Sequence, residues 1–419
     1  MKNQKKRRVR KFPKKVNPKL IPEVNIGMVG HVDHGKSTLV EALTGKWPAL
    51  HSEELKRGIT IRLGYADVTF YKCPKCNTYL TSKKCHKCFV NADIIRTVSF
   101  VDVPGHESLM ATVLTGSALM NGAILVIAAD EKCPLPQTRE HLTALEVVGI
   151  KNIIIVQNKI DLVTPERAEK SYEEIKNFVN GLIAESAPII PISAQQKINI
   201  GYIIEAIENH IPTPKRETEK NPKMIIARSF DVNKPGAKPE KLIGGIIGGS
   251  IVQGKLKVGD EIEIRPGIRI GDEWKSIKTK IVSMEKAGVK LEEAGTGGLL
   301  GVLTKLDPYF TKADGFVGNV VGLPGKIPPV LLKLKLKTHL LERVVGTKEL
   351  ETVSNIKQEE NLLINVGTAR SIGIVEGIKG NQIEVKLKIP VCVDNNDRIV
   401  FSRQVLGRWR LIGWGEIVD

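Results

Sequence analysis

The loop from Gly30 to Ser37 (GHVDHGKS) combines glycines, a lysine and a hydroxyl at the spacing G-x-x-x-x-G-K-[ST]. It follows an apolar run and precedes a helical pattern, which is the context in which this spacing forms a phosphate-binding loop. Backbone N–H groups of the loop and the helix N-terminus would point at the phosphates. Lys36 would contact the β- and γ-phosphates, and the Ser37 hydroxyl would ligate Mg²⁺. We therefore expect the phosphates on six consecutive residues: Asp33, His34, Gly35, Lys36, Ser37 and Thr38.

A second chemical motif, DVPGH, begins at Asp102, where the next apolar run ends. A carboxylate at this point can hold Mg²⁺ through a water molecule. Gly105 could offer its N–H to the γ-phosphate. The D-x-x-G pattern alone is a common turn, but at a strand end downstream of a phosphate loop it indicates a nucleotide site.

Two further motifs each follow an apolar run, and they indicate the base. Asn158, Lys159 and Asp161 (NKID) follow the run IIIVQ. A carboxylate accepts hydrogen bonds, so Asp161 can take two N–H bonds from guanine, whereas adenine has no matching donors. NKID in third place therefore favours GTP over ATP. The segment SAQ, which would support the base, consists of Ser193, Ala194 and Gln195.

The segment RGIT, from Arg57 to Thr60, lies between the first two motifs. A threonine there can ligate Mg²⁺ only while a γ-phosphate holds the loop in place. This would make the loop a switch, ordered by GTP and released after hydrolysis. A threonine that caps a local turn is the alternative.

Four of the six cysteines form two CxxC pairs separated by eight residues: Cys73, Cys76, Cys85 and Cys88. Thiolates at this spacing can present four sulfurs to Zn²⁺, and four protein ligands imply a structural site. Five lysines between residues 72 and 87 would offset the negative charge. Iron–sulfur binding, disulfides, and a cluster without metal in vivo are the alternatives. Each CxxC pair is called a knuckle below. His86 lies between the two cysteines of the second knuckle and is not expected to bind the metal.

These motifs require a sheet that brings the ends of several strands together. Strands are expected at Val24–Val29, Ile94–Val103, Ala123–Ala129, Ile153–Gln157 and Ile189–Ile192, and helices at Ser37–Leu43, Pro165–Ile183 and Asn199–Ile211. Their alternation predicts a doubly wound, mostly parallel α/β sheet. This domain is expected to span residues 20–214, with the cysteine insertion at about 71–92.

After the linker IPTPK at residues 211–215 the pattern changes to short strands among glycines. The segments Glu261–Arg265, Ile281–Ser283, Leu332–Lys337 and Gln382–Ile389 are expected strands. On the LKLKLK strand, alternation predicts leucines toward a core and lysines outward. We expect two β-barrel domains, at residues 215–327 and 328–419.

The formal net charge of +17 is unevenly distributed. Residues 1–19 carry ten Lys or Arg and no acid, and they are expected to form a flexible basic arm. Residues 215–419 carry 34 basic and 25 acidic residues. Such a surplus usually indicates a polyanionic partner. Arginines near Phe401, Trp409 and Trp414 could contact RNA, but the favoured interpretation is barrel core with solvated charges.

No apolar run approaches the roughly 20 residues that span a bilayer, and the basic N-terminus lacks a signal-peptide core. The chain is therefore expected to be cytoplasmic, without a membrane partner.

On the five motifs GHVDHGKS, RGIT, DVPGH, NKID and SAQ, the chain resembles the translational GTPases, including elongation factor Tu, over residues 20–419. The paired cysteines and three segments, HSEELKRG at 51–58, RSFDVNKPG at 228–236 and RWRLIGWG at 408–415, are similar to the gamma subunits of archaeal or eukaryotic initiation factor 2. Ser37 stands where many relatives have threonine, and serine retains the hydroxyl group at this position. In its compactness, the chain is more similar to the archaeal proteins than to the eukaryotic ones.

The resemblance implies a slow GTPase with GTP or GDP, Mg²⁺ and Zn²⁺ as cofactors. Ser37 and Thr60 would bind the catalytic Mg²⁺, Asp102 would act through water, and Asp33 with the Gly58 carbonyl would bind a second Mg²⁺. His106 would orient the hydrolytic water, unless it is a structural loop imidazole. The implied gate that limits access of this water consists of Val32 and Ile59. No motif identifies an arginine finger, so hydrolysis should need an external trigger.

The resemblance also implies partners: initiator methionyl-tRNA, the small ribosomal subunit, and alpha and beta subunits in a heterotrimer. Two alternative functions are an elongation factor that delivers aminoacyl-tRNA and a zinc-containing RNA-binding scaffold without hydrolysis. Intact Lys36, Ser37, Thr60, Asp102 and His106 argue against the scaffold.

Overall fold

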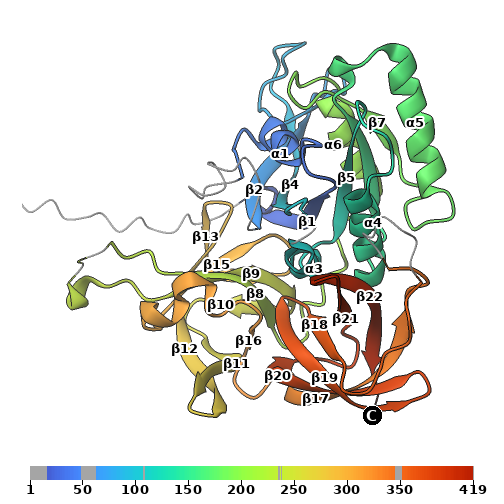
Figure 1. Ribbon diagram of the computed structural model, residues 1–419. Coiled ribbons are helices and arrows are strands. Elements are labelled where there is room, and N and C mark those ends of the chain that lie inside the picture. The colour runs from blue at the N-terminus through green and yellow to red at the C-terminus, as the bar shows by residue number, and fades with distance from the viewer. Residues whose placement is uncertain are drawn as a thin grey trace, which may run out of the picture.

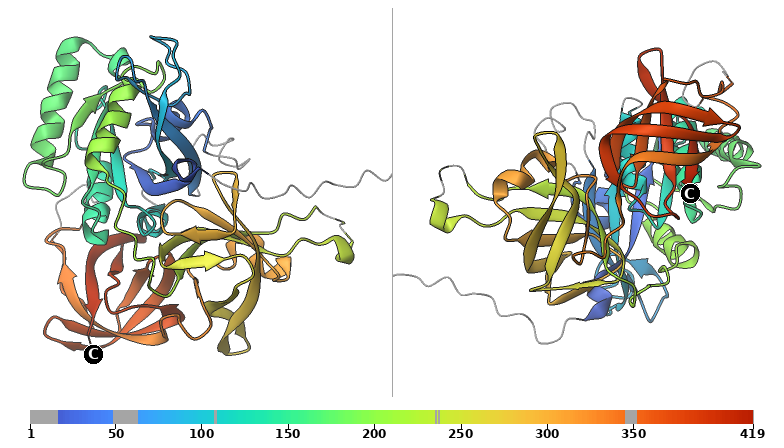
Figure 2. Two further views of the ribbon diagram at one scale, coloured as in Figure 1. Left: turned by 180° about the vertical axis from the view of Figure 1, so that it is seen from behind. Right: turned by 90° about the horizontal axis from the view of Figure 1, so that it is seen from below.

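The computed structural model describes residues 17–48, 63–106, 109–234, 236, 238–344 and 352–418. Figure 1 shows an α/β domain above two β-barrels, and Figure 2 shows that the barrels lie side by side. No helix among the described residues is both long and apolar enough to span a membrane.

The α/β domain is built on a seven-stranded sheet in the order β3-β2-β4-β1-β5-β6-β7. β2 is antiparallel to β4 and β3 is antiparallel to β2, and the other neighbours are parallel. The strands are β1 (Pro22–Val29), β2 (Gly64–Lys72), β3 (Tyr79–Leu80), β4 (Asp93–Asp102), β5 (Gly122–Ala128), β6 (Ile153–Asn158) and β7 (Ile189–Pro191). β5 and β6 are buried along their whole length, as expected for apolar central strands covered on both faces.

Helices cover both faces of this sheet. α1 (Lys36–Thr44) and α6 (Ile200–His210) pack on one face, and α3 (Met110–Ser117), α4 (Pro136–Val148) and α5 (Pro165–Val179) pack on the other. The predicted doubly wound fold is therefore confirmed. α5 ends four residues before the predicted Ile183, because Asn180 leaves the helical conformation with a ψ of 126° and Gly181 follows with a φ of 72°.

The first barrel closes through six strands in the order β11-β16-β8-β9-β15-β12, since β12 also pairs with β11. β13 extends the sheet beside β12, and β10 pairs with β14. The strands are β8 (Lys223–Phe230), β9 (Ile246–Gln253), β10 (Lys255–Lys257), β11 (Glu261–Ile270), β12 (Glu273–Lys286), β13 (Val289–Leu291), β14 (Glu293–Gly295), β15 (Leu300–Thr304) and β16 (Val320–Gly322). Its loops contain the short 3₁₀ turn η4 (Pro239–Lys241) and the kinked 3₁₀ segment η5 (Pro308–Asp314).

The second barrel closes in the order β17-β20-β19-β18-β21-β22, which confirms the prediction of two barrels. Its strands are β17 (Val330–Leu340), β18 (Asn361–Val366), β19 (Ala369–Lys379), β20 (Gln382–Cys392), β21 (Ile399–Val405) and β22 (Arg408–Ile417). Leu334 and Leu336 of β17 face the core as predicted, but Leu332 is exposed. The pairing of β17 with β20 shifts between Leu331 and Lys333, and this irregularity breaks the alternation.

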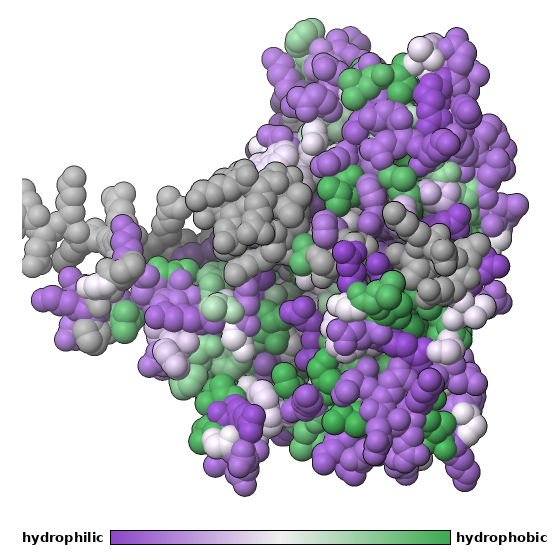
Figure 3. Space-filling model, viewed as in Figure 1, coloured by the Kyte–Doolittle hydropathy of each residue, from purple (hydrophilic) through white to green (hydrophobic). Residues whose placement is uncertain are grey.

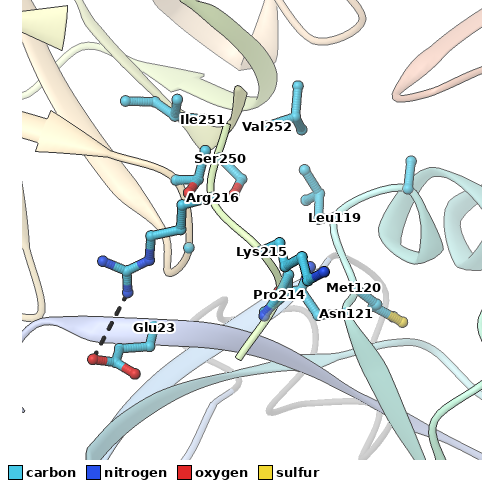
Figure 4. A pocket seen from close by; sticks show the side chains of 13 residues that line it. Glu23, Leu119, Met120, Asn121, Pro214, Lys215, Arg216, Ser250, Ile251 and Val252 are labelled. Carbon is cyan, nitrogen blue, oxygen red and sulfur yellow. Dashed lines mark ion pairs between the residues drawn. The ribbon is translucent and has the colours of Figure 1, made fainter. Parts of the chain in front are cut away.

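The α/β domain contacts both barrels. Arg216, which follows the linker, points toward Glu23 of β1, with 3.7 Å between the charged atoms, beside a small cavity that Ser250 of β9 also lines (Figure 4). On the other side, Arg410 of β22 donates to Glu140 of α4 at 2.5 Å. Both charged side chains of this second pair are buried.

Residues 17–20 are docked rather than free. A short 3₁₀ turn, η1 (Pro18–Leu20), contacts β4: Lys19 Nζ donates to the Ile94 carbonyl at 2.9 Å, and Thr97 Oγ1 donates to the Lys19 carbonyl at 2.8 Å. The last residues of the predicted flexible arm therefore belong to the folded domain. Residues 1–16, the rest of that arm, lie outside the described residues.

Candidate functional site

The phosphate loop joins β1 to α1, as its motif predicts. Gly30 has a φ of 136° and Gly35 a φ of 88°, conformations that favour glycine. A Cβ on Gly30 would lie 2.3 Å from the Val126 carbonyl oxygen, and one on Gly35 would lie 2.3 Å from Asn158 Nδ2. The two glycines are therefore required both by conformation and by close approach to β5 and to the end of β6.

Lys36, Ser37 and Asp102 come together at the carboxyl edge of the sheet. Ser37 Oγ donates to Asp102 Oδ2 at 2.6 Å, and Lys36 Nζ donates to the His31 carbonyl at 2.6 Å. Burial lowers the pKa of Lys36 to about 8, although the Asp102 carboxylate opposes the shift. A bound phosphate would stabilise this buried ammonium. Hydroxyl and carboxylate oxygens are ligands that Mg²⁺ accepts, so this pair fits the cation that accompanies a nucleotide.

Gly105 lies against the phosphate loop, but His106 at the same turn is exposed. A Cβ on Gly105 would lie 2.5 Å from Lys36 Nζ and 2.9 Å from the Val32 nitrogen. The Gly105 backbone is thus adjacent to the expected phosphate position. His106 accepts a hydrogen bond from the Leu109 N–H through its carbonyl at 2.9 Å, and its side chain is at the surface.

Asn158 joins the two base-binding motifs to the phosphate loop. Its Nδ2 donates to the His34 carbonyl at 2.9 Å, and its Oδ1 accepts from the Ala194 N–H at 2.9 Å. Through these two bonds Asn158 holds the phosphate loop beside the SAQ segment, and its predicted place at the base stays a prediction. Asp161 remains exposed in η3 (Ile160–Leu162), where its carboxylate can take the donors of guanine.

The rest of the base loop is held by local contacts. Lys159 has a φ of 65°, and its Nζ lies 3.1 Å from Asp130 Oδ2. Ser193 Oγ accepts from the Gln196 N–H at 3.1 Å, and Gln195 is exposed. These bonds hold the NKID and SAQ segments at one end of the sheet.

His141 of α4 is a site residue that the motifs did not reveal. Its Nδ1 accepts the N–H of Gly30 at 2.7 Å, and burial lowers its pKa to about 3, so it is neutral. His34 donates from Nδ1 to the Val126 carbonyl at 3.1 Å, and burial lowers its pKa to about 3 as well. His34 is thus a support of the loop. A lone histidine on an amphipathic helix carries no pattern that would have identified His141.

Four predicted residues lie outside the described residues: Arg57, Gly58, Ile59 and Thr60. The predicted switch and its Mg²⁺ ligands therefore stay predictions. Asp33, the other residue expected at the second Mg²⁺, is described and has a φ of 60° in the phosphate loop. Thr38 is in the first turn of α1.

The four paired cysteines converge, as their spacing predicts. Their Sγ atoms all lie within 4.8 Å of one another, and Cys76 and Cys85 are 3.6 Å apart. A tetrahedral zinc site with Zn–S bonds of about 2.3 Å would have sulfurs about 3.8 Å apart. The residues present therefore fit a zinc ion.

Two matching turns present the cysteines. The Asn77 N–H donates to the Cys73 carbonyl, and the Phe89 N–H donates to the Cys85 carbonyl, both at 2.9 Å. Asn77 and Phe89 have φ values of 56° and 55°, so each CxxC segment is followed by one residue in the left-handed conformation. The cluster thus has the paired form of a structural metal site.

The aromatic and basic residues of the second barrel are mostly committed to packing. Phe401 is fully buried, and Arg403 pairs with Glu360. Trp414 stacks on His339, with 4.3 Å between the ring centroids, and under the Arg398 guanidinium, 4.2 Å from the ring centroid. These contacts favour the structural interpretation over direct RNA contact by these side chains.

Three families match successive parts of the chain. Elongation factor Tu GTP binding domain matches residues 22–213, Elongation factor Tu domain 2 matches residues 244–318, and Initiation factor eIF2 gamma, C terminal, matches residues 332–417. The matches correspond to the α/β domain and the two barrels.

Two relatives resemble the chain over nearly its whole length. Translation initiation factor 2 subunit gamma of Pyrococcus abyssi is 60% identical over 401 residues, which are 95% of this chain and 98% of the relative. The protein of the same name from Methanocaldococcus jannaschii is 56% identical over 399 residues, 94% and 97% of the two chains.

Two solved structures share the fold at low sequence identity. A bacterial selenocysteine-specific elongation factor, EF-Sec, superposes with a TM-score of 0.74 at 24% identity, over 95% of this chain and 58% of that chain. Elongation factor SelB from Methanococcus maripaludis, in complex with the GTP analogue GppNHp, superposes with a TM-score of 0.70 at 22% identity, over 96% of this chain and 80% of that chain. These two likenesses show the fold alone.

Proposed function

Because the chain belongs to the family of gamma subunits of translation initiation factor 2 and is a translational GTPase, we propose that it binds initiator methionyl-tRNA in its GTP form and delivers it to the small ribosomal subunit. Release would follow GTP hydrolysis. The observation that carries this proposal is the sequence identity of 56–60% to two gamma subunits of translation initiation factor 2. This similarity extends across the α/β domain and both barrels. We further propose that it works in the cytoplasm.

GTP is held by the hydrogen-bonded loops around Asn158. Backbone N–H groups of residues 33–38 and the Lys36 ammonium bind the phosphates, Gly105 offers an N–H to the γ-phosphate, and Asp161 takes the donors of guanine. Ser37 and Thr60 would hold the Mg²⁺, with Asp102 acting through water and Asp33 with Gly58 serving a second cation. Mg²⁺ neutralises charge on the β- and γ-phosphates when it is bound.

His106 and Thr60 would couple hydrolysis to the state of the switch. His106 lies at the surface next to Gly105, where it can orient a water only after the neighbouring loops close around the nucleotide. Val32 and Ile59 would restrict that water. Because the motifs contain no arginine finger, the isolated chain positions the hydrolytic water and the γ-phosphate incompletely. Hydrolysis of GTP should therefore be slow without an external trigger.

The cysteine knuckles would hold one structural Zn²⁺ on Cys73, Cys76, Cys85 and Cys88. The converging thiols and the two matching turns support this assignment. The ion would join the two turns, and with four protein ligands it would have no open position for chemistry.

Alpha and beta subunits are the proposed partners in a heterotrimer. The test of the whole proposal uses the full chain, with and without an alpha-like subunit, loaded with GppNHp or GDP. Filter binding would measure affinity for initiator and for elongator methionyl-tRNA. We expect preference for the initiator tRNA with GppNHp and weaker binding with GDP.

The alternatives give different results in the same experiment. Equal affinity for both tRNAs in every nucleotide state would overturn initiator delivery. GppNHp-dependent preference for the elongator tRNA would instead support an elongation factor. GTP turnover by the isolated chain tests the slow-hydrolysis proposal, which rapid turnover without partners would contradict.

A further inference from the structure

The cysteine insertion presents a positive surface that the proposed function does not use. Residues 72–92 contain five lysines and no aspartate or glutamate. The insertion projects from the end of the α/β domain farthest from the barrels (Figure 1), at an end of the molecule that is predominantly hydrophilic (Figure 3). Even four thiolates with one Zn²⁺ would add only two negative charges, so this surface stays positive and suits a polyanion. Its exposed lysines are Lys75, Lys83, Lys84 and Lys87.

Phe89 is the unusual residue of this surface. The second knuckle needs a left-handed residue after Cys88, and the equivalent position of the first knuckle carries Asn77, which tolerates that conformation. A bulky phenylalanine at a φ of 55° is unfavourable, and burial does not compensate, because the side chain is 72% exposed. A costly backbone position that displays an aromatic face to solvent indicates a ligand for that face.

A groove adjoins the knuckles. It has a volume of about 610 Å³ and separates the insertion from the first turn of α6. Tyr79 and Lys87 line one wall, and Lys197 and Tyr202 line the other. Among the described residues that line it, Glu205 is the one carboxylate. Basic and aromatic groups therefore continue from the knuckle tip along the groove.

We propose that this surface binds single-stranded RNA, with an unpaired base stacked on Phe89 and phosphates paired with Lys83, Lys84 and Lys87. Lys84 Nζ already lies 5.9 Å from the centre of the Phe89 ring, which places a cation beside the stacking face. Stacking on exposed aromatics combined with lysine–phosphate pairing is how proteins bind unpaired RNA. An acidic protein would also meet the lysines, but it would have no use for the strained aromatic face.

The first test replaces Phe89 in the full GDP-loaded chain and measures binding of a fluorescent twelve-nucleotide oligo(A) by anisotropy. Phe89→Asn should weaken binding about tenfold, because one stacked base is lost. Phe89→Tyr keeps an aromatic ring and should bind within about twofold of the parent chain. Asparagine suits the left-handed turn, so Phe89→Asn should retain its zinc and have an equal or higher melting temperature.

The second test separates these lysines from other surface lysines. Lys83→Ala combined with Lys84→Ala should reduce the slope of log affinity against log salt by about 1.4, as expected for two lost phosphate contacts to a single strand. The matched control changes Lys170 and Lys176 of α5, which are also exposed, to alanine and should leave the slope unchanged. The basic N-terminal residues are common to all variants and cancel in the comparison.

Several outcomes would overturn the inference. Unchanged oligo(A) affinity in Phe89→Asn would exclude stacking on this ring. Equal competition by a twelve-residue polyglutamate would indicate an acidic protein as the partner, and equal competition by duplex RNA would exclude an unpaired base.

This inference does not depend on initiator tRNA delivery. Oligo(A) binding should be the same with GDP and GppNHp, and Phe89→Asn should keep GppNHp-dependent tRNA binding. A failure of one proposal is therefore distinguishable from a failure of the other.

Discussion

At the scale of single residues, Asn158 organises the nucleotide site. Its amide joins the backbone of His34 in the phosphate loop to that of Ala194 in the SAQ segment. Gly35 is required partly because a larger residue would collide with this amide. One buried side chain thus holds three motifs that are far apart in the sequence.

Replacement of Asn158 by alanine should therefore weaken the binding of GTP and of GDP by the same factor, roughly 10- to 100-fold. Two buried hydrogen bonds would be lost, and their partners would be left unsatisfied. Titration with fluorescent GDP and GTP analogues measures this. Asn152→Ala, which removes a single bond to the Asn121 carbonyl at 3.2 Å, is the control and should change little. Loss of GTP affinity alone would contradict a shared positioning role.

Lys286 predicts a pH dependence of stability. Its Nζ donates to the carbonyls of Gly295 and Gly297, and burial lowers its pKa to about 7. The unfolded lysine titrates near 10.4, so between these values the unfolded state binds more protons than the folded state. Stability from this group should therefore rise as the pH increases from 7 toward 10.

The measurement compares the parent chain with Lys286→Met in urea unfolding at pH 7 and pH 9. The parent should gain up to about 2 kcal/mol relative to the variant over this interval. A constant difference between the two proteins would show that Lys286 does not titrate in this range. Lys290→Met, a change at an exposed lysine of β13, is the control.

At the scale of elements, the cysteine insertion is a small unit attached to the β2–β4 pair. Its core consists of Tyr71, Leu80 and the cysteines, and it is separate from the two clusters that fill the sheet faces. The contacts of the nucleotide site come from the phosphate loop and from α1, β4, β6 and α4. The insertion can therefore lose its order while the nucleotide site stays intact.

Cys85→Ser should reduce bound zinc from about one ion per chain to near zero and leave GDP affinity within about twofold, because a structural zinc site needs all four ligands. Metal analysis of freshly reduced protein and a GDP titration measure the two effects. Cys133→Ser, at a half-buried cysteine outside the cluster, should keep its zinc. Zinc retention by Cys85→Ser would show that the cluster is not the site.

At the scale of the whole molecule, α4 links the nucleotide site to the second barrel. Its adjacent residues Glu140 and His141 contact Arg410 of β22 and Gly30 of the phosphate loop. Arg398 donates to the carbonyls of Glu146 and Val147 at the end of the same helix. The barrel is therefore attached to the helix that supports the loop.

The buried Glu140–Arg410 pair predicts a strong asymmetry between single and double changes. Arg410→Met should lower stability by about 3–5 kcal/mol, because it leaves a carboxylate buried without its partner. Glu140→Met combined with Arg410→Met should recover most of this loss, since both charges are then removed. Thermal unfolding of the three proteins measures the effect, with Arg408→Met at the exposed start of β22 as the control. A double variant that is no more stable than Arg410→Met would show that the buried carboxylate and guanidinium do not depend on each other.

The sequence by itself determined the features that depend on neighbours along the chain. The phosphate loop, the cysteine knuckles and the alternation of strands and helices follow from spacing, because each reflects local turn geometry or the period of one element. Only the tertiary structure decided the contacts between distant segments. His141 on Gly30, Arg410 on Glu140 and the exposure of Leu332 depend on how elements pack and where one strand pairing shifts. Such contacts carry no periodic signal, since the partners are brought together by the packing of layers and not by their spacing.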